Sequence, residues 1–101
     1  MKYFILFIIL FSSPLYAVDL VSSKYKCTHN DNDLVREVRI IHQDQGCQVT
    51  YTKAVGTVNE NTKYLWRAKN STEYCDNKGH AFVEEKLQQE FGWVCIDTIT
   101  K

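Results

Sequence analysis

Residues 70–95, NSTEYCDNKGHAFVEEKLQQEFGWVC, decide the fold, because the pattern of apolar residues changes here from strand-like to helical. Asn70-Ser71-Thr72-Glu73 is typical of a capping box, with Asn70 as the N-cap and Glu73 three residues later. The residues that follow predict an α-helix with one apolar side. We expect that side to carry Cys75, Gly79, Phe82, Val83, Leu87 and Phe91. Gly92 then predicts the end of the helix.

The segments on either side of this helix are rich in β-branched and aromatic residues and predict strands. Four precede the helix, at 24–28, 34–42, 47–53 and 63–69, and one follows it, at 93–99. This order predicts an α+β fold: a mostly antiparallel sheet of about five strands (ββββαβ) with one helix packed on one face. Strict alternation in the fourth strand would place Tyr64 and Trp66 on one side of the sheet and Arg67 on the other.

The N-terminal residues have the layout of a secretory signal peptide. Lys2 precedes an apolar run at 4–11, FILFIILF, and Ala17 supplies a small residue for cleavage. That run is far shorter than the ~20 residues that cross a bilayer as a helix. We therefore expect a signal peptide at 1–17 with cleavage near Ala17. Residues 18–101 would then form a single small domain in the periplasm or outside the cell.

The four cysteines of the chain all follow this segment. An even number in a small exported domain indicates disulfides and an oxidising compartment. The helix would carry the chain ~24 Å away from Cys75, and the returning strand recovers only ~13 Å before Cys95. In a meander, Cys27 and Cys47 would lie at opposite ends of their strands. The topology therefore predicts the bonds Cys47–Cys75 and Cys27–Cys95.

The sequence contains no set of residues with the spacing of a known catalytic or metal site. Cys75 and His80 would lie about 140° apart on a helix, too far for a nucleophile and its base. The cysteines contain no C-x₂-C pair for zinc, and the loop at 29–33 lacks the glycine and the glutamate of a calcium loop. We predict no cofactor and no metal, and the sequence favours a protein that is not an enzyme.

Charge and aromatic content point to the kind of ligand. The chain has 12 basic and 12 acidic residues and no basic cluster, so we expect no binding to nucleic acid. Aromatic residues and arginines are numerous for so small a domain, and one sheet face has no second layer to cover it. Aromatic residues that face the helix would belong to the core. Those on the open face, beside Arg36, Arg39 or Arg67, would form a surface of the composition typical of protein binding. The candidate binding residues are Trp66, Arg67, Arg39 and Tyr64.

Three functions agree with these observations. The first is a non-catalytic binding or accessory domain, acting on a protein or a cell-envelope component, for example as an inhibitor. The second is a small secreted enzyme or effector that uses His42 or His80 with a nearby carboxylate as acid and base. The third is a purely structural envelope protein. The sequence does not indicate an oligomeric state, and we expect no transmembrane segment after the signal peptide.

A set of short motifs extends over almost all of the chain after the signal peptide. It comprises Tyr25-x-Cys27, Gly46-Cys47-x-Val49-x-Tyr51-x-Lys53, Leu65-Trp66-Arg67-Ala68, Tyr74-Cys75, Ala81-Phe82-Val83 and Gly92-Trp93-x-Cys95. In these motifs the chain resembles a group of small uncharacterised exported four-cysteine proteins of Gram-negative bacteria. The resemblance implies a compartment and a disulfide-linked scaffold, and it implies no particular reaction.

Overall fold

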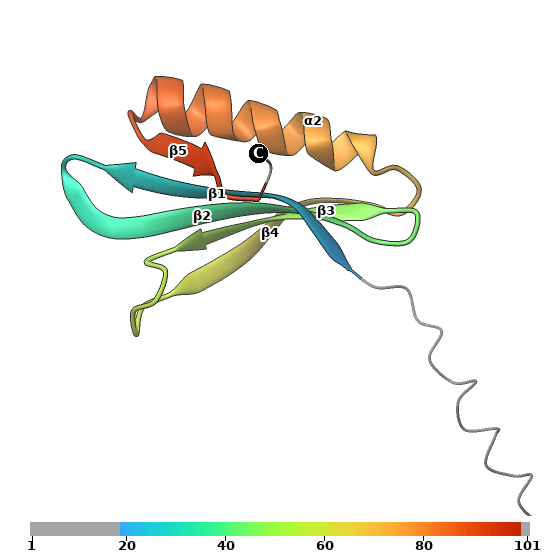
Figure 1. The fold of residues 1–101 in the computed structure, drawn as a ribbon, viewed down its shortest axis with the longest axis horizontal. Coiled ribbons are helices and arrows are strands. Elements are labelled where there is room, and N and C mark those ends of the chain that lie inside the picture. The colour runs from blue at the N-terminus through green and yellow to red at the C-terminus, as the bar shows by residue number, and fades with distance from the viewer. Residues whose placement is uncertain (1–18, 100–101) are drawn as a thin grey trace, which may run out of the picture.

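A five-stranded sheet with one helix across it makes up the described part of the chain, as predicted (Figure 1). The structure is a computed structural model that describes residues 19–99. The strands are β1 (Leu20–His29), β2 (Asn32–His42), β3 (Cys47–Lys53), β4 (Asn61–Ala68) and β5 (Val94–Asp97). Their order in the sheet is β4-β3-β2-β1-β5, and every neighbouring pair is antiparallel. The predicted signal peptide, 1–17, lies outside the described residues.

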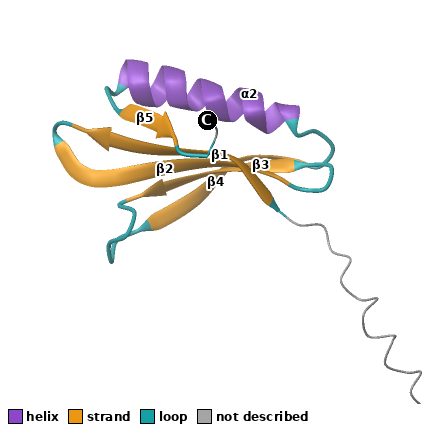
Figure 2. Ribbon diagram, viewed as in Figure 1, coloured by secondary structure: helices purple, strands orange, loops and turns teal. Residues whose placement is uncertain are grey.

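The helix covers one face of the sheet, and the opposite face carries no second layer among the described residues (Figure 2). It consists of α2 (Glu73–Ala81), which continues directly into a π-helical segment, η1 (Phe82–Glu90). The predicted N-cap was wrong: Thr72 occupies that position without a side-chain hydrogen bond. Instead, the Ser71 hydroxyl accepts a hydrogen bond from the Tyr74 N–H at 3.1 Å. Gly92, with φ 75°, turns the chain after the helix.

The π-helical segment changes which residues share a side of the helix. Its hydrogen bonds reach five residues back, as from the Phe91 N–H to the Lys86 carbonyl at 3.0 Å. A π-helix has about 4.4 residues per turn, whereas an α-helix has 3.6. Phe82 and Phe91 are nine positions apart in the sequence. This separation would place the two rings on opposite sides of an α-helix, about 180° apart, but it brings them to nearly the same side of a π-helix. The two rings therefore project on one side of the helix.

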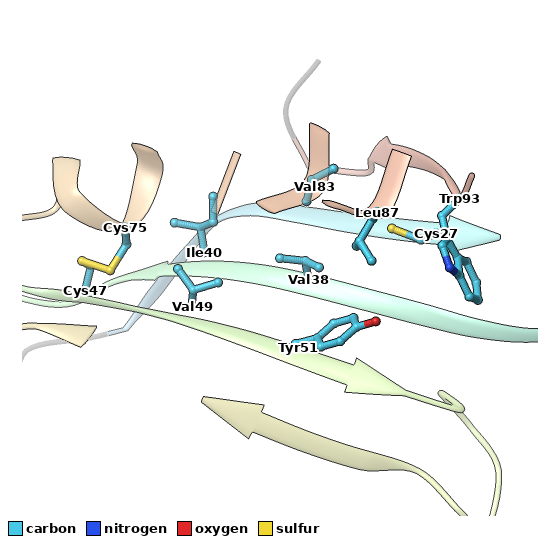
Figure 3. Packing of buried hydrophobic residues seen from close by; sticks show 10 residues of the cluster. All are labelled: Cys27, Val38, Ile40, Cys47, Val49, Tyr51, Cys75, Val83, Leu87 and Trp93. Atoms are coloured by element: carbon cyan, nitrogen blue, oxygen red, sulfur yellow. A yellow bond between two sulfur atoms is a disulfide. The ribbon is translucent and has the colours of Figure 1, made fainter. Parts of the chain in front are cut away.

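The buried helix residues recur at every fourth position: Cys75, Gly79, Val83 and Leu87. The sequence analysis placed Phe82 and Phe91 with them, but Phe82 is only half-buried and Phe91 is 54% exposed. The buried set packs on side chains that point up from the sheet, as Figure 3 shows: Cys27, Val38, Ile40, Cys47, Val49 and Tyr51. A Cβ on Gly79 would lie 2.7 Å from two atoms of Ile40, so this glycine permits the helix to lie close to the sheet.

Both disulfides have the predicted connectivity. Cys27 and Cys95 are register partners on β1 and β5 and are bonded to each other. The Cys47–Cys75 bond ties the start of β3 to the first turn of α2. The two bonds thus hold the helix and the last strand to the sheet, and they fit an oxidising compartment.

A β-bulge in β4 changes the predicted sides of that strand. Val49 pairs with Trp66, but the next residue of β3, Thr50, pairs with Tyr64, so β4 contains one extra residue at this point. The expectation that Tyr64 shares a side with Trp66 was therefore wrong. Trp66 lies on the helix-covered face, whereas Tyr64 lies on the open face together with Arg67.

Candidate functional site

Three of the four predicted binding residues lie on the open face of the sheet. Arg39, Thr50 and Tyr64 form a row across β2, β3 and β4. The Arg67 guanidinium carbon lies 4.6 Å from the centre of the Tyr64 ring, which is 57% exposed. Arg39 is already paired, because its Nε lies 2.8 Å from a Glu37 carboxylate oxygen. The structure therefore brings Tyr64 and Arg67 together and leaves Arg39 engaged nearby.

The fourth predicted residue, Trp66, belongs to the opposite face. Its ring packs against Phe82 of η1, with the ring centres 5.9 Å apart. Trp66 is half-buried and borders a hollow between β4 and the helix. The four residues predicted from the sequence thus do not form one surface.

The two histidines of the enzyme hypothesis each connect the helix to the sheet. His42 of β2 lies 2.9 Å from a carboxylate oxygen of Asp76. His80 contacts the Tyr25 hydroxyl through its Nδ1. Burial raises the pKa of the Tyr25 phenol above its ordinary value of 10.0, and nearby carboxylates raise it further, so the hydroxyl keeps its proton at neutral pH. Neither histidine borders the hollows described below.

A cleft that combines cationic and aromatic side chains lies where η1 meets the ends of β2 and β3. We call it the Arg36 cleft; it has a volume of about 600 Å³. Its cationic side chains are Arg36, Lys53 and Lys86, and its rings belong to His29, Tyr51, Phe82, Phe91 and Trp93. Cations beside aromatic rings, in a concave site, suit a ligand that joins an anionic group to an apolar one.

Arg36 is held firmly at the centre of this cleft. Its guanidinium carbon lies 4.4 Å from the centre of the Trp93 ring, and Trp93 is almost fully buried. Its Nη1 donates a hydrogen bond to the Tyr51 hydroxyl at 2.6 Å. A guanidinium has five N–H donors, so Arg36 keeps donors for a carboxylate or phosphate. Its half-buried position restricts the side chain and lowers the entropy lost on binding.

The His29 ring forms one wall of the cleft in a defined tautomer. Its Nδ1 accepts a hydrogen bond from the Asp31 N–H at 3.0 Å, so Nε2 carries the proton and donates to the Phe91 carbonyl at 3.0 Å. The ring also packs edge-on against Trp93, with the centres 5.1 Å apart. Both ring nitrogens are therefore engaged, and His29 acts as a wall that positions Trp93 and the end of the helix.

A second, apolar hollow of about 460 Å³ lies along the same side of the helix. We call it the Trp66 hollow; Leu65, Trp66, Ala81 and Phe82 form its apolar lining, and Lys78, Glu85 and Lys86 form its rim. Phe82 and Lys86 also border the Arg36 cleft. The two hollows are therefore neighbours that share Phe82 and Lys86, and we call them together the helix groove.

The helix groove is locally basic although the whole chain has a formal net charge of zero. Arg36, Lys53, Lys78 and Lys86 line it, against Asp31 and Glu85. One of these cations is partly offset, because the Lys86 ammonium lies 3.1 Å from a Glu90 carboxylate oxygen in an exposed pair. Exposed pairs of this kind are weak, so the groove still favours an acidic ligand.

The helix groove was not predicted from the sequence, although one signal for it was present. Arg36 has the same parity along β2 as the buried Val38 and Ile40, so alternation places it on the helix-covered face. Phe82 and Phe91 were expected on the buried side of an α-helix, and the α-helical period does not reveal the π-helical segment that leaves them at the partly exposed groove.

Comparison of the chain with known protein families, curated proteins and solved structures found no match. No helix within residues 19–99 is long and apolar enough to cross a membrane. In the same part of the chain, no three His, Cys, Asp or Glu side chains are grouped so that they could hold a metal ion.

Proposed function

We propose that this chain is a non-catalytic, exported binding domain that recognises an acidic group of a protein or cell-envelope component in its helix groove. The observation that carries the proposal is the fixed Arg36 guanidinium, held by Trp93 and Tyr51 within a cleft that also contains Lys53 and Lys86. A positioned arginine beside aromatic rings is typical of residues that dominate binding energy. The domain would act as an inhibitor or an accessory factor.

The compartment in this proposal is the periplasm or the exterior, reached after signal-peptide cleavage near Ala17. The two disulfides support an oxidising environment. Export would also expose the basic groove to envelope proteins and acidic envelope polymers, which are ligands that an acidic-group receptor could use.

The experiment is a crosslinking pull-down with the purified, disulfide-bonded protein against the envelope and culture supernatant of its source. The test variant is Lys53→Gln with Lys86→Gln, because both lysines are exposed and border the cleft. The control is Lys26→Gln with Lys69→Gln, which removes the same charge from exposed positions outside the groove. Unreduced peptide mapping verifies that both variants keep the two disulfides.

We expect a specific partner that the wild type and the control capture and that the groove variant loses. The opposite result, capture that survives loss of the groove lysines but is lost on Arg67→Ala, would move the site to the open face. Absence of any partner, together with turnover of an envelope substrate, would replace the binding function with an enzymatic one.

A further inference from the structure

We propose that the ligand of the helix groove is an extended peptide segment of a partner protein, about five or six residues long, with an apolar side chain at one end and an acidic one at the other. The inference rests on the proposed function and names the class of ligand. It follows from the neighbouring positions of the Arg36 cleft and the Trp66 hollow, which share Phe82, because each hollow selects a different kind of side chain.

The length of the segment follows from the helix residues that border the groove. These extend from Lys78, at the Trp66 hollow, to Phe91, at the Arg36 cleft. This part of the helix is roughly 15–20 Å long, given a rise of at most 1.5 Å per residue. An extended chain advances about 3.3 Å per residue, so five or six residues reach from one hollow to the other.

The apolar end of the segment would lie in the Trp66 hollow. The bulge in β4 directs both Leu65 and Trp66 to this hollow, and both are half-buried. Ala81 opposite them is small, so the helix leaves space for a side chain of the ligand. An aliphatic or aromatic residue would bury here the apolar surface of Trp66 and Phe82 that remains exposed.

The acidic end would lie in the Arg36 cleft, where Arg36, Lys53 and Lys86 converge. Charge therefore sets the orientation of the segment: a reversed peptide would place its carboxylate in the apolar hollow, where desolvation is costly. Both hollows lie along the same side of the helix, so one extended segment can reach from one to the other.

The test is selection of a random nonapeptide phage library on the immobilised, disulfide-bonded protein. Enriched peptides are expected to share an aliphatic or aromatic residue four to six positions from an aspartate or glutamate. The consensus peptide is then synthesised with a fluorescent label, and its affinity is measured by anisotropy. Replacing either its apolar or its acidic residue should weaken binding at least about tenfold, or 1.4 kcal/mol.

Two protein variants locate the two ends. Ala81→Glu places a charge in the Trp66 hollow, and Gln89→Glu is the matched control because it adds the same charge at an exposed helix position outside the groove. Ala81→Glu should weaken the consensus peptide at least about tenfold, whereas Gln89→Glu should change its affinity less than about twofold. Lys53→Gln with Lys86→Gln should weaken it and reduce its salt dependence.

The outcomes separate this inference from the proposed function. One outcome is acidic peptides that have no apolar residue at a fixed distance and whose affinity Ala81→Glu does not change. It would overturn the proposal of a segment with an apolar and an acidic end, and it would leave the proposed binding of an acidic group in place. Peptides that ignore both the Ala81 and the lysine variants would overturn both proposals. Absence of enrichment over the bare support would overturn the peptide as the ligand and leave a non-peptide acidic component.

Discussion

Replacing Gly79 by alanine tests how closely the helix lies against the sheet. The added Cβ would lie 2.7 Å from both Cδ1 and Cγ1 of Ile40, and 3.5 Å from Cγ2 of Val49. Ile40 and Val49 are fully buried, so neither side chain can turn into solvent. Close packing in a protein interior means that the new methyl group has to displace one of its neighbours.

Two opposing effects decide the sign of the change in stability. Alanine is favoured over glycine in a helix by about 1 kcal/mol. Overpacking a well-filled core costs about 1–3 kcal/mol. We therefore expect Gly79→Ala to lower the free energy of unfolding by about 1 kcal/mol, instead of raising it by the amount that helix propensity alone would give.

The assay is urea unfolding with both disulfides intact, followed by circular dichroism and analysed as two-state. Ile40→Val removes Cδ1 and so relieves part of the contact. The double variant with Gly79→Ala should therefore lose at least about 0.5 kcal/mol less unfolding free energy than the two single variants lose when their losses are added. The difference in stability between Asn77→Ala and Asn77→Gly, at an exposed helix position, measures the propensity gain alone. A Gly79→Ala protein about 1 kcal/mol more stable than wild type, with additive behaviour toward Ile40→Val, would refute the close contact.

Three further predictions concern other parts of the scaffold. A Cβ on Gly46 would lie 2.2 Å from the Ala68 carbonyl oxygen, which is backbone, so Gly46→Ala should lower the urea midpoint and cost about 2 kcal/mol or more; an unchanged midpoint would contradict it. Replacing Cys47 and Cys75 by serine opens a crosslink between residues 28 positions apart and should cost about 3–4 kcal/mol in the same assay; a loss below about 1 kcal/mol would contradict the chain-entropy argument. The raised pKa of Tyr25 means that the folded state holds the phenolic proton more tightly. The protonated Tyr25 phenol therefore stabilises the fold below pH 10.0, its ordinary pKa, and this contribution is lost as the pH rises through the higher pKa of the folded state. In an ultraviolet absorbance titration, the wild type should show a tyrosine step above pH 10.0 that Tyr25→Phe lacks.

The architecture could be predicted because it follows from local periods and simple lengths. Alternation at 47–53 and the helical pattern after Asn70 identify the layers, and the length of the helix separates Cys75 from Cys95. Cys75 and Cys95 remain far apart even with the smaller rise of the π-helical segment, so the choice of partners does not depend on the exact helix type. The disulfide connectivity was therefore accessible from the sequence.

The candidate site was less accessible because it depends on two irregularities. The β4 bulge moves Tyr64 to the face opposite Trp66, and in the π-helical segment Phe82 and Phe91 line the cleft instead of the buried core. Neither irregularity has a sequence signature, since each results from fitting the helix and β4 to the rest of the sheet. Arg36 is different: its place on the helix-covered face follows from alternation with Val38.

The connectivity of the disulfides has a consequence for how the protein is made. The bond between residues 47 and 75 is nested inside the bond between residues 27 and 95. If the chain crosses a membrane N-terminus first, Cys27 and Cys47 meet the oxidising side together, although they are not partners in the fold. A rapid oxidant acting on the emerging chain would join them wrongly, and thiol–disulfide exchange would have to correct the bond. On that route, efficient maturation would call for a disulfide isomerase, or for oxidation that waits until Cys95 has emerged.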